Sequence, residues 1–200
     1  MVAAVVFDLD GVVRLWPQSL SHQIEATFSL PDGAFAAVAF DTELVEQAVS
    51  GAIADQDWRQ QVAERLSARF GTDGAGAVAL WSHVRGEVDQ ELLALTQMVR
   101  RNVPIALLTN ATTRLGEDLE ALDLMDSFDF VFNSSEIGSA KPHEACFRHV
   151  LTSLGMAAQD CALIDDTAGH VTAASALGFR GHLYHSQVDA ARFLREVEVL

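Results

Sequence analysis

The feature that most constrains this chain is a series of short, nearly continuous apolar runs with helical segments between the later ones. Apolar runs of this length that do not alternate with polar residues are typical of strands buried on both faces, as in parallel sheets. Five runs have this character, the last more weakly: residues 2–7, 103–108, 128–132, 161–164 and 181–184. We therefore expect a parallel sheet.

Segments with helical periodicity separate the later runs. The segment "DQELLALTQMVRRN" repeats Leu92, Leu95 and Val99 on one face. Similar apolar faces follow Thr113 and Pro142, at Leu115, Leu119 and Leu122, and at Phe147, Val150, Leu151 and Leu154. Alternation of strand and helix predicts a doubly wound parallel α/β sheet, with right-handed crossovers that put helices on both sides.

The stretch from about residue 14 to residue 86 breaks that alternation, because it has helical patterns and no strand-like run. Its clearest pattern is the apolar face formed by Trp58, Val62, Leu66 and Phe70. We predict a helical domain at residues 14–89, inserted into a catalytic core of residues 1–13 and 90–200. The alternative is that these helices extend a single domain, although a crossover needs only about a dozen residues.

Composition narrows the function classes. The chain has 28 acidic and 13 basic residues, a net charge of −15, and no stripe of Lys and Arg, so nucleic acid is excluded as a partner. Cys146 and Cys161 are too few for a disulfide framework. No apolar run approaches the roughly 20 residues of a membrane span, and acids interrupt the N-terminal run, which argues against a signal peptide. We expect a cytoplasmic monomer or homodimer.

Polar residues follow three of the predicted strands, and a lysine precedes a predicted helix that starts at or near Pro142. These residues are Asp8 and Asp10, Thr109 and Asn110, Asp165 and Asp166, and Lys141. Ligands of open α/β sheets bind beyond the carboxyl ends of the strands. The sequence therefore predicts one site on that edge, although strand-end solvation, turns or helix caps would explain each residue singly.

Clustered carboxylates repel each other unless a cation offsets their charge. Oxygen ligands without His or Cys suit Mg²⁺, which binds one or two carboxylates together with phosphate oxygens. Lys141, Thr109 and Asn110 supply the positive charge and hydrogen bonds that a bound phosphate requires. The expected ligand is a small phosphorylated metabolite with Mg²⁺ as the cofactor.

Four segments in order, "DLDGV", "LLTN", "SAKP" and "LIDDT", resemble the motifs of the haloacid dehalogenase superfamily, in its phosphatase-type branch with a small helical cap. The resemblance implies that Asp8 is a nucleophile that forms an aspartyl-phosphate, and that Asp10 is the general acid and base. It implies that Thr109 and Lys141 hold the phosphoryl group, with backbone amides near Asn110. The implied metal ligands are the Asp8 carboxylate, the Asp10 backbone carbonyl and the Asp166 carboxylate, with Asp165 beside them.

Several alternatives remain on this scaffold. Dehalogenases of the superfamily lack an acid at the position of Asp10, so Asp10 favours phosphoester hydrolysis over dehalogenation. Phosphomutases use the same acid, and a non-catalytic binding protein would be favoured only by loss of the motif acids. A two-component receiver domain shares these residue types in a different order.

Some residues depart from the family pattern or stay open. His170 stands where many members have Asn, close enough to Asp166 to affect the metal site, and His143 stands where an acid is common. A structural His at a helix start is the simpler interpretation of His170. Trp16, Trp58 and Trp81 either line a substrate pocket or belong to the core, and Arg114 faces either the pocket mouth or solvent.

Overall fold

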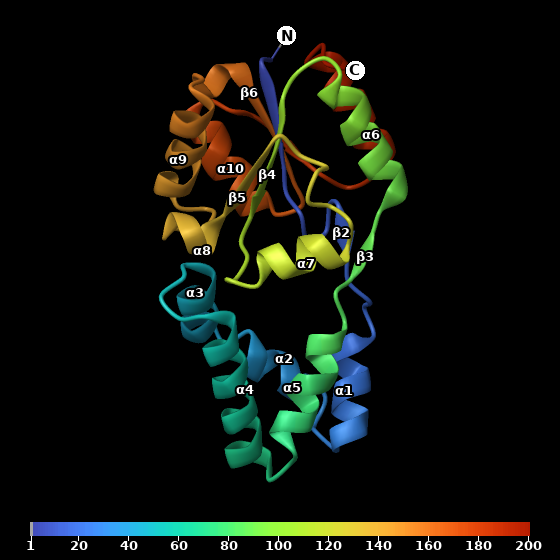
Figure 1. Ribbon diagram of the computed structural model, residues 1–200, viewed down its shortest axis with the longest axis vertical. Helices are drawn as coiled ribbons and strands as arrows, with labels where there is room; N and C mark the ends of the chain where they lie inside the picture. Colours follow the sequence, from blue (N-terminus) through green and yellow to red (C-terminus); the bar gives the residue numbers. More distant parts are fainter. Residues whose placement is uncertain (1) are drawn as a thin grey trace.

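The structure, a computed structural model that describes residues 2–200, contains one parallel five-stranded sheet with the strand order β5-β4-β1-β6-β7. The strands are β1 (Ala4–Phe7), β4 (Ile105–Thr109), β5 (Phe130–Asn133), β6 (Cys161–Asp165) and β7 (Arg180–Leu183). The elements between and after them are α6 (Gln90–Arg100), α7 (Leu115–Ala121), α8 (Ser134–Ile137), α9 (Glu144–Leu154), a 3₁₀ turn (Ala158–Asp160), α10 (Ala168–Leu177) and α11 (Gln187–Glu196). The predicted fold class is confirmed (Figure 1).

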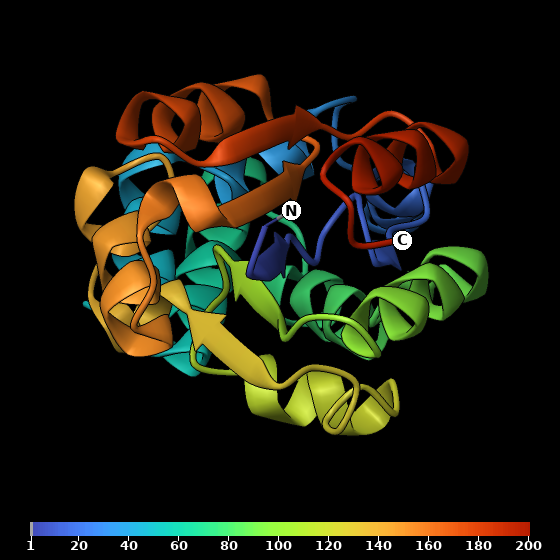
Figure 2. The ribbon, with the colours of Figure 1, turned by 90° about the horizontal axis from the view of Figure 1, so that it is seen from above.

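Strand β1 lies at the centre of the sheet because all four of its residues are apolar and buried. Its side chains alternate between the two faces. Val5 and Phe7 belong to the core beneath α6, α7 and α11, and Ala4 and Val6 belong to the core beneath α9 and α10. Figure 2 shows these helices on opposite sides of the sheet. Burial on both faces explains why the strands are continuous apolar runs.

The element ends differ slightly from the sequence predictions. Each predicted strand is present, with ends displaced by up to two residues. The helix expected at or near Pro142 begins instead at Glu144, because His143 is extended, with φ −61° and ψ 134°, and is the residue before the first turn. Lys141 therefore belongs to the turn before α9, and its side chain reaches Asp8 and Asp165 at the ends of β1 and β6.

Two very short strands lie where no strand was predicted. β2 (Arg14–Leu15) and β3 (Glu87–Val88) pair antiparallel, with Arg14 opposite Val88. Two residues are too few to give an alternating pattern, so the sequence carries no signal for them. The pair connects the sheet to the five helices inserted between β2 and β3.

These five helices, which we call the helical insert, are α1 (Leu20–Phe28), α2 (Ala34–Ala39), α3 (Thr42–Val49), α4 (Asp55–Phe70) and α5 (Gly74–His83). They surround a hydrophobic core of their own, which includes Phe35, Trp58, Val62 and Leu66. Figure 1 shows the insert beyond the carboxyl edge of the sheet, where β1 and β4 end. The domain boundaries given above, 1–13 with 90–200 and 14–89, stay a prediction.

Helix α4 shows how the sequence encodes an element of the insert. Trp58, Val62 and Leu66 form its buried face, as the spacing predicts. Acidic residues in its first turn and Arg69 in its last turn complement the helix dipole. Gly71 ends the helix with φ 66°, a left-handed conformation that glycine adopts without strain. Among residues 2–200, no helix combines the length and apolar character needed to cross a bilayer.

Candidate active site

The predicted site residues gather at the carboxyl edge of the sheet. An open cavity there is lined by polar side chains from the ends of β1, β4 and β6, which we call the polar cavity. Its lining includes Asp8, Asp10, Thr109, Asn110, Asp166, Thr167 and His170. Lys141 and Asp165 lie buried directly behind this lining. Parallel strands deliver their carboxyl ends to one edge, so residues distant in sequence meet there.

Lys141, the only lysine of the chain, links two of these carboxylates. Its Nζ lies 2.8 Å from Asp8 Oδ1 and 2.6 Å from Asp165 Oδ2, and it donates a hydrogen bond to the Leu108 carbonyl. The side chain is fully buried, which by itself would lower the pKa of Lys141. The charges of Asp8 and Asp165 outweigh burial and raise that pKa, so the amine stays protonated.

Asn110 holds the backbone of Lys141. The Asn110 side-chain amide donates to the Lys141 carbonyl, and its oxygen accepts from the Lys141 backbone N–H, both at 2.8 Å. The resemblance suggested a contact with substrate, and Asn110 does line the polar cavity. Its side-chain hydrogen bonds, however, fix the turn that carries the lysine. Thr109, at the end of β4, is buried beside it and also lines the cavity.

Asp8 is buried at the end of β1. Its Oδ1 accepts a hydrogen bond from the Leu9 backbone N–H at 2.7 Å and contacts Lys141. Burial raises the pKa of Asp8 above its usual range, against the opposing charge of Lys141, and the negative charge of Asp165 adds to the increase. The single buried lysine contacts both Asp8 and Asp165, so its positive charge does not fully offset the cost of burying the Asp8 carboxylate.

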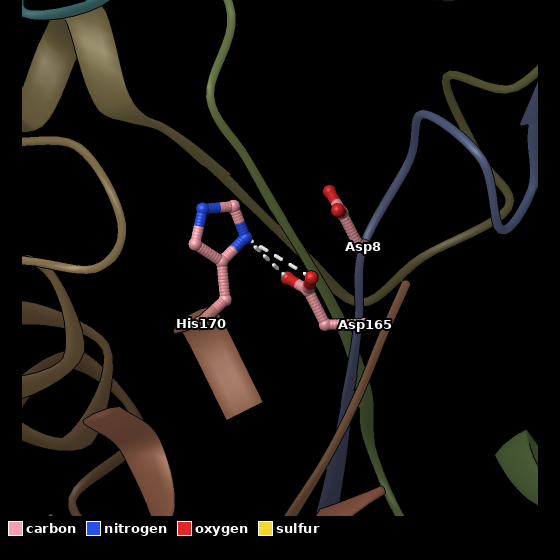
Figure 3. A group of neighbouring side chains, drawn as sticks. All are labelled: Asp8, Asp165 and His170. Carbon is pink, nitrogen blue, oxygen red and sulfur yellow. Dashed lines mark hydrogen bonds and ion pairs between the residues drawn. The ribbon is translucent and has the colours of Figure 1, made fainter. Parts of the chain in front are cut away.

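Asp165 is completely buried and has more partners than Asp8. Besides Lys141, it accepts hydrogen bonds from the Thr167 backbone N–H at 2.8 Å and lies 3.0 Å from His170 Nδ1. Burial alone would raise its pKa, but the His170 hydrogen bond and the Lys141 charge outweigh burial and lower it to about 2. Figure 3 shows the His170 ring directed at both oxygens of Asp165, with Asp8 on the neighbouring strand. The structure places His170 on Asp165, whereas the sequence suggested Asp166.

Asp166 differs from Asp165 in facing the solvent side of the edge. Its carboxylate packs against the turn after Asp10, so closely that a Cβ on Gly11 would lie 2.0 Å from Asp166 Oδ2. Gly11 also has φ +80°, a conformation that other residues rarely adopt. The turn therefore requires glycine, and it brings the Asp166 carboxylate beside the residues that follow β1.

The donor set fits a hard divalent cation. Asp8, Asp10 and Asp166 offer carboxylate and carbonyl oxygens around the polar cavity, and a cation there would lower the raised pKa of Asp8. Asp8, Asp165 and His170 also offer ligand atoms within 4.8 Å of one another. Lys141 already contacts both carboxylates of that second group, so the Asp8 and Asp166 side of the edge suits a cation better.

Asp10 has partners that the sequence analysis missed. Arg14 donates hydrogen bonds to both side-chain oxygens of Asp10, with Nε 2.6 Å from Oδ1 and Nη2 2.9 Å from Oδ2. The Trp16 indole N–H also donates to Oδ1, at 2.6 Å. The turn after β1 brings Arg14 back to Asp10 and so allows this bidentate pair. In that turn the Gly11 N–H donates to the Arg14 carbonyl. The spacing of Asp10 and Arg14, four residues apart outside a helix, gave no recognisable signal.

Arg14 also connects Asp10 to α7. Its Nη1 lies 3.1 Å from Asp118 Oδ2, and the other oxygen of Asp118 accepts from Arg85 and Arg114. Arg114, left open by the sequence, thus pairs with Asp118 and donates to the Ser82 carbonyl of the insert. This network of charges lies where the sheet meets the helical insert.

A second cavity, of about 460 Å³, lies between the sheet edge and the helical insert, and we call it the apolar cavity. All three tryptophans line it, so Trp16, Trp58 and Trp81 belong to a pocket wall, and Trp58 and Trp81 also pack in the core of the insert. His143, by contrast, is exposed at the start of α9 and lines neither cavity.

Comparison with known proteins agrees with this geometry. The family model of the haloacid dehalogenase-like hydrolases matches residues 2–178. A sesquiterpene phosphatase from Aspergillus oryzae is 27% identical over 188 residues, which cover 92% of this chain and 90% of that protein. A phosphoglycolate phosphatase from Pectobacterium atrosepticum is 32% identical over 87 residues, 43% of this chain and 37% of that protein. A drimenol cyclase from Aspergillus calidoustus is 29% identical over 115 residues, 55% of this chain, and the match spans only 22% of the cyclase.

Solved structures share the fold. The magnesium complex of a family enzyme from Bacteroides thetaiotaomicron superimposes with a TM-score of 0.78 at 18% identity, covering 97% of this chain and 98% of that one. An L-2-haloacid dehalogenase from Xanthobacter autotrophicus with chloropropionic acid covalently bound gives a TM-score of 0.66 at 20% identity, covering 100% and 85%. At these identities the likeness establishes the architecture alone.

Proposed function

The chain belongs to the haloacid dehalogenase-like hydrolase family, and on that premise we propose that it is a Mg²⁺-dependent hydrolase of small phosphomonoesters. The proposal rests on one observation above all: Asp8 and the fully buried Lys141 meet at the sheet edge while Asp10, two residues on, lines the same cavity. The sesquiterpene phosphatase and the phosphoglycolate phosphatase among its relatives support hydrolysis of phosphoesters.

In the proposed mechanism, an Asp8 carboxylate oxygen attacks phosphorus and forms an aspartyl-phosphate as the bond from phosphorus to the leaving oxygen breaks. Asp10 gives its proton to that leaving oxygen, and the alcohol departs. Asp10 then takes a proton from water, which attacks the phosphorus. Phosphate leaves and the Asp8 carboxylate is restored, so the cycle consumes one water per ester.

The surrounding residues would hold the phosphoryl group and its charge. Lys141 and Thr109 lie at the edge beside Asp8, and the backbone N–H groups near Leu9 and Asn110 are available to developing negative charge. The Asp8 carboxylate, the Asp10 carbonyl and the Asp166 carboxylate would bind Mg²⁺, with Asp165 beside them. When bound, the metal offsets the negative charge of the carboxylates and the phosphate.

Arg14 sets a condition on this mechanism. It donates to both side-chain oxygens of Asp10, and Trp16 donates to one of them, so each oxygen already accepts a hydrogen bond. To carry a proton, Asp10 must give up one of these hydrogen bonds. The proposed cycle therefore includes a shift of Asp10 relative to Arg14 when the ester binds.

The test is phosphate release from a panel of phosphomonoesters at millimolar Mg²⁺, with and without chelator, alongside chloride release from 2-chloropropionate. We expect phosphate release that chelator abolishes and Mg²⁺ restores. Replacing the nucleophile, Asp8→Asn, should lower turnover by at least about 10⁴-fold, while the exposed matched control Asp126→Asn retains it. Chloride release, or phosphate release that survives in Asp8→Asn, would refute the proposal.

A further inference from the structure

We propose that the ester's leaving group is an apolar alcohol, bound in the apolar cavity beneath the helical insert. This inference rests on the proposed function, because it assigns the substrate class of that same site. It follows from the position of the cavity, from the state of its charged side chains and from its aromatic lining.

The position of the cavity comes first. The polar and apolar cavities share three wall residues, Asp10, Trp16 and Asn110. An ester with its phosphoryl group in the polar cavity thus has its leaving oxygen at this shared wall, where Asp10 can reach it. Whatever is attached to that oxygen extends into the apolar cavity, whose 460 Å³ lies within the roughly 300–1,000 Å³ typical of ligand pockets.

The charged residues of the apolar cavity are already paired with one another. Of its lining residues, the two arginines are Arg14, bound to Asp10 and Asp118, and Arg59, whose Nε lies 2.7 Å from Asp55 Oδ2. Asp55 also accepts a hydrogen bond from Thr112. Because each of these cations has a carboxylate partner, none is left for an anionic leaving group such as a carboxylic acid or a second phosphate.

The remaining wall is mostly aromatic and aliphatic. Phe35, Phe40, Trp58 and Trp81 pack edge to face, with ring centroids 5.0–6.3 Å apart, and present their rings to the cavity. Phe40 is 52% exposed, an unusual degree for a large apolar side chain. Leu20, Val45, Val49 and Leu115 complete this surface. An apolar chain would cover it, whereas a sugar would leave its hydroxyl groups without partners.

The first experiment measures kcat/KM for phosphate release along a series of n-alkyl phosphates from ethyl to octyl, each below its micellar concentration. Each methylene that becomes buried should raise kcat/KM by about fourfold, until the cavity is full. We expect octyl phosphate to exceed ethyl phosphate by about a hundredfold or more. Glucose 6-phosphate and phosphoglycolate should be poorer substrates than octyl phosphate.

A variant at the cavity wall sharpens this measurement. Phe40→Ser should lower kcat/KM for octyl phosphate about tenfold more than for ethyl phosphate, because the shorter ester reaches less of the wall. The control is Phe130→Ser, a change at another exposed phenylalanine that lies on the edge strand β5 and lines neither cavity. It should leave the chain-length dependence unchanged. Thermal unfolding monitored by circular dichroism is the check that both variants are folded.

The second experiment does not need turnover. Because all three tryptophans line the apolar cavity, intrinsic tryptophan fluorescence reports on its contents. Titration with octan-1-ol should change the fluorescence saturably, more weakly in Phe40→Ser, and glycerol should not.

Equal kcat/KM along the series, or no saturable signal with octan-1-ol, overturns the apolar substrate even if esters are hydrolysed. Saturable binding of octan-1-ol without hydrolysis of any ester overturns the proposed function instead.

Discussion

The cavity at the sheet edge and the cavity beneath the helical insert differ in the chemistry of their walls, which are charged and polar in the first and mostly apolar in the second. At the sheet edge, buried charges face one another, with Lys141 between Asp8 and Asp165. In the insert, rings such as Trp58 and Trp81 face a cavity whose charged side chains are paired among themselves. The comparison teaches that the proposed bond-breaking groups lie on the sheet edge, whereas most of the proposed leaving-group pocket is supplied by the insert, with Asp10, Trp16 and Asn110 common to both cavities.

A small number of contacts joins the two regions. Ser134 Oγ donates to the Val49 carbonyl at 2.6 Å, and the Asp55 N–H donates to Thr113 Oγ1 at 3.0 Å. On the other side of the interface, Arg14 connects Asp10 to Asp118. Since Asp10 belongs to the wall of both cavities, it is the residue through which the insert acts most directly on the proposed chemistry.

The largest effect should come from Lys141→Met, which removes the buried ion pairs at the sheet edge and leaves the apolar cavity unchanged. Without the amine, Asp8 is left as an uncompensated buried carboxylate, and Asp165 keeps only its contacts with the Thr167 backbone N–H and His170. We expect the free energy of unfolding to fall by about 3–5 kcal/mol and phosphate release to fall by about 10³-fold. Urea denaturation and a phosphate assay measure both. Arg148→Met, at an exposed position on α9, is the control, and equal losses in the two variants would contradict the buried bridge.

Both cysteines lie in the core that packs against the sheet, and the next largest predicted effect concerns their rate of reaction with a thiol reagent. Burial raises the pKa values of Cys146 and Cys161 from 9.0 to about 11. The charge of Lys141 opposes this increase at Cys146, and the charge of Asp160 adds to it at Cys161. Only the thiolate reacts, and raising the pKa lowers its population at any pH below that value. Both side chains are also completely buried, so thiol labelling at pH 8 should be at least about a hundredfold slower in the folded chain than in urea, and its rate should rise about tenfold per pH unit. Fast labelling at pH 8 would show that this core opens readily.

At the junction of the two regions, Arg14→Lys should have a smaller effect. Lysine keeps the charge but loses the fork that binds both oxygens of Asp10. We expect kcat for phosphate release to fall about tenfold, because Asp10 is no longer oriented, with less change in KM. Arg85→Lys is the matched control, since Arg85 pairs with Asp118 and not with Asp10, and its kcat should change by less than about twofold. A larger loss in Arg85→Lys would place the important contact at Asp118.

The same two regions differ in how far the sequence predicts them. Asp8, Thr109, Asp165 and Asp166 could be assigned to one edge because strand direction alone determines where the ends of parallel strands lie. The pairing of Arg14 with Asp10 could not, because it depends on the conformation of one glycine-containing turn and on a strand only two residues long.

The walls of the apolar cavity were equally hard to predict. The helical face that contains Trp58 was evident, but a periodic face tells only that a side chain is buried. Whether its neighbours leave an opening depends on how five helices pack against one another and against α7. Trp81 and Phe40 therefore acquire their place in the cavity wall from tertiary packing, not from a motif.

The smallest effect tests whether the two regions unfold separately, as the predicted division at residues 14–89 requires. Thr113→Val removes the acceptor of the Asp55 N–H, at a cost of about 1 kcal/mol. The tryptophans line the apolar cavity and the cysteines lie in the sheet core, so fluorescence and thiol labelling follow different regions of one chain. We expect the fluorescence midpoint in urea to move lower while native-state labelling of Cys146 and Cys161 keeps its rate. Thr152→Val on α9 should change neither by more than about 0.5 kcal/mol. If Thr113→Val shifts both probes equally, the insert and the sheet unfold as a single unit, because a weakened junction then destabilises both cores together.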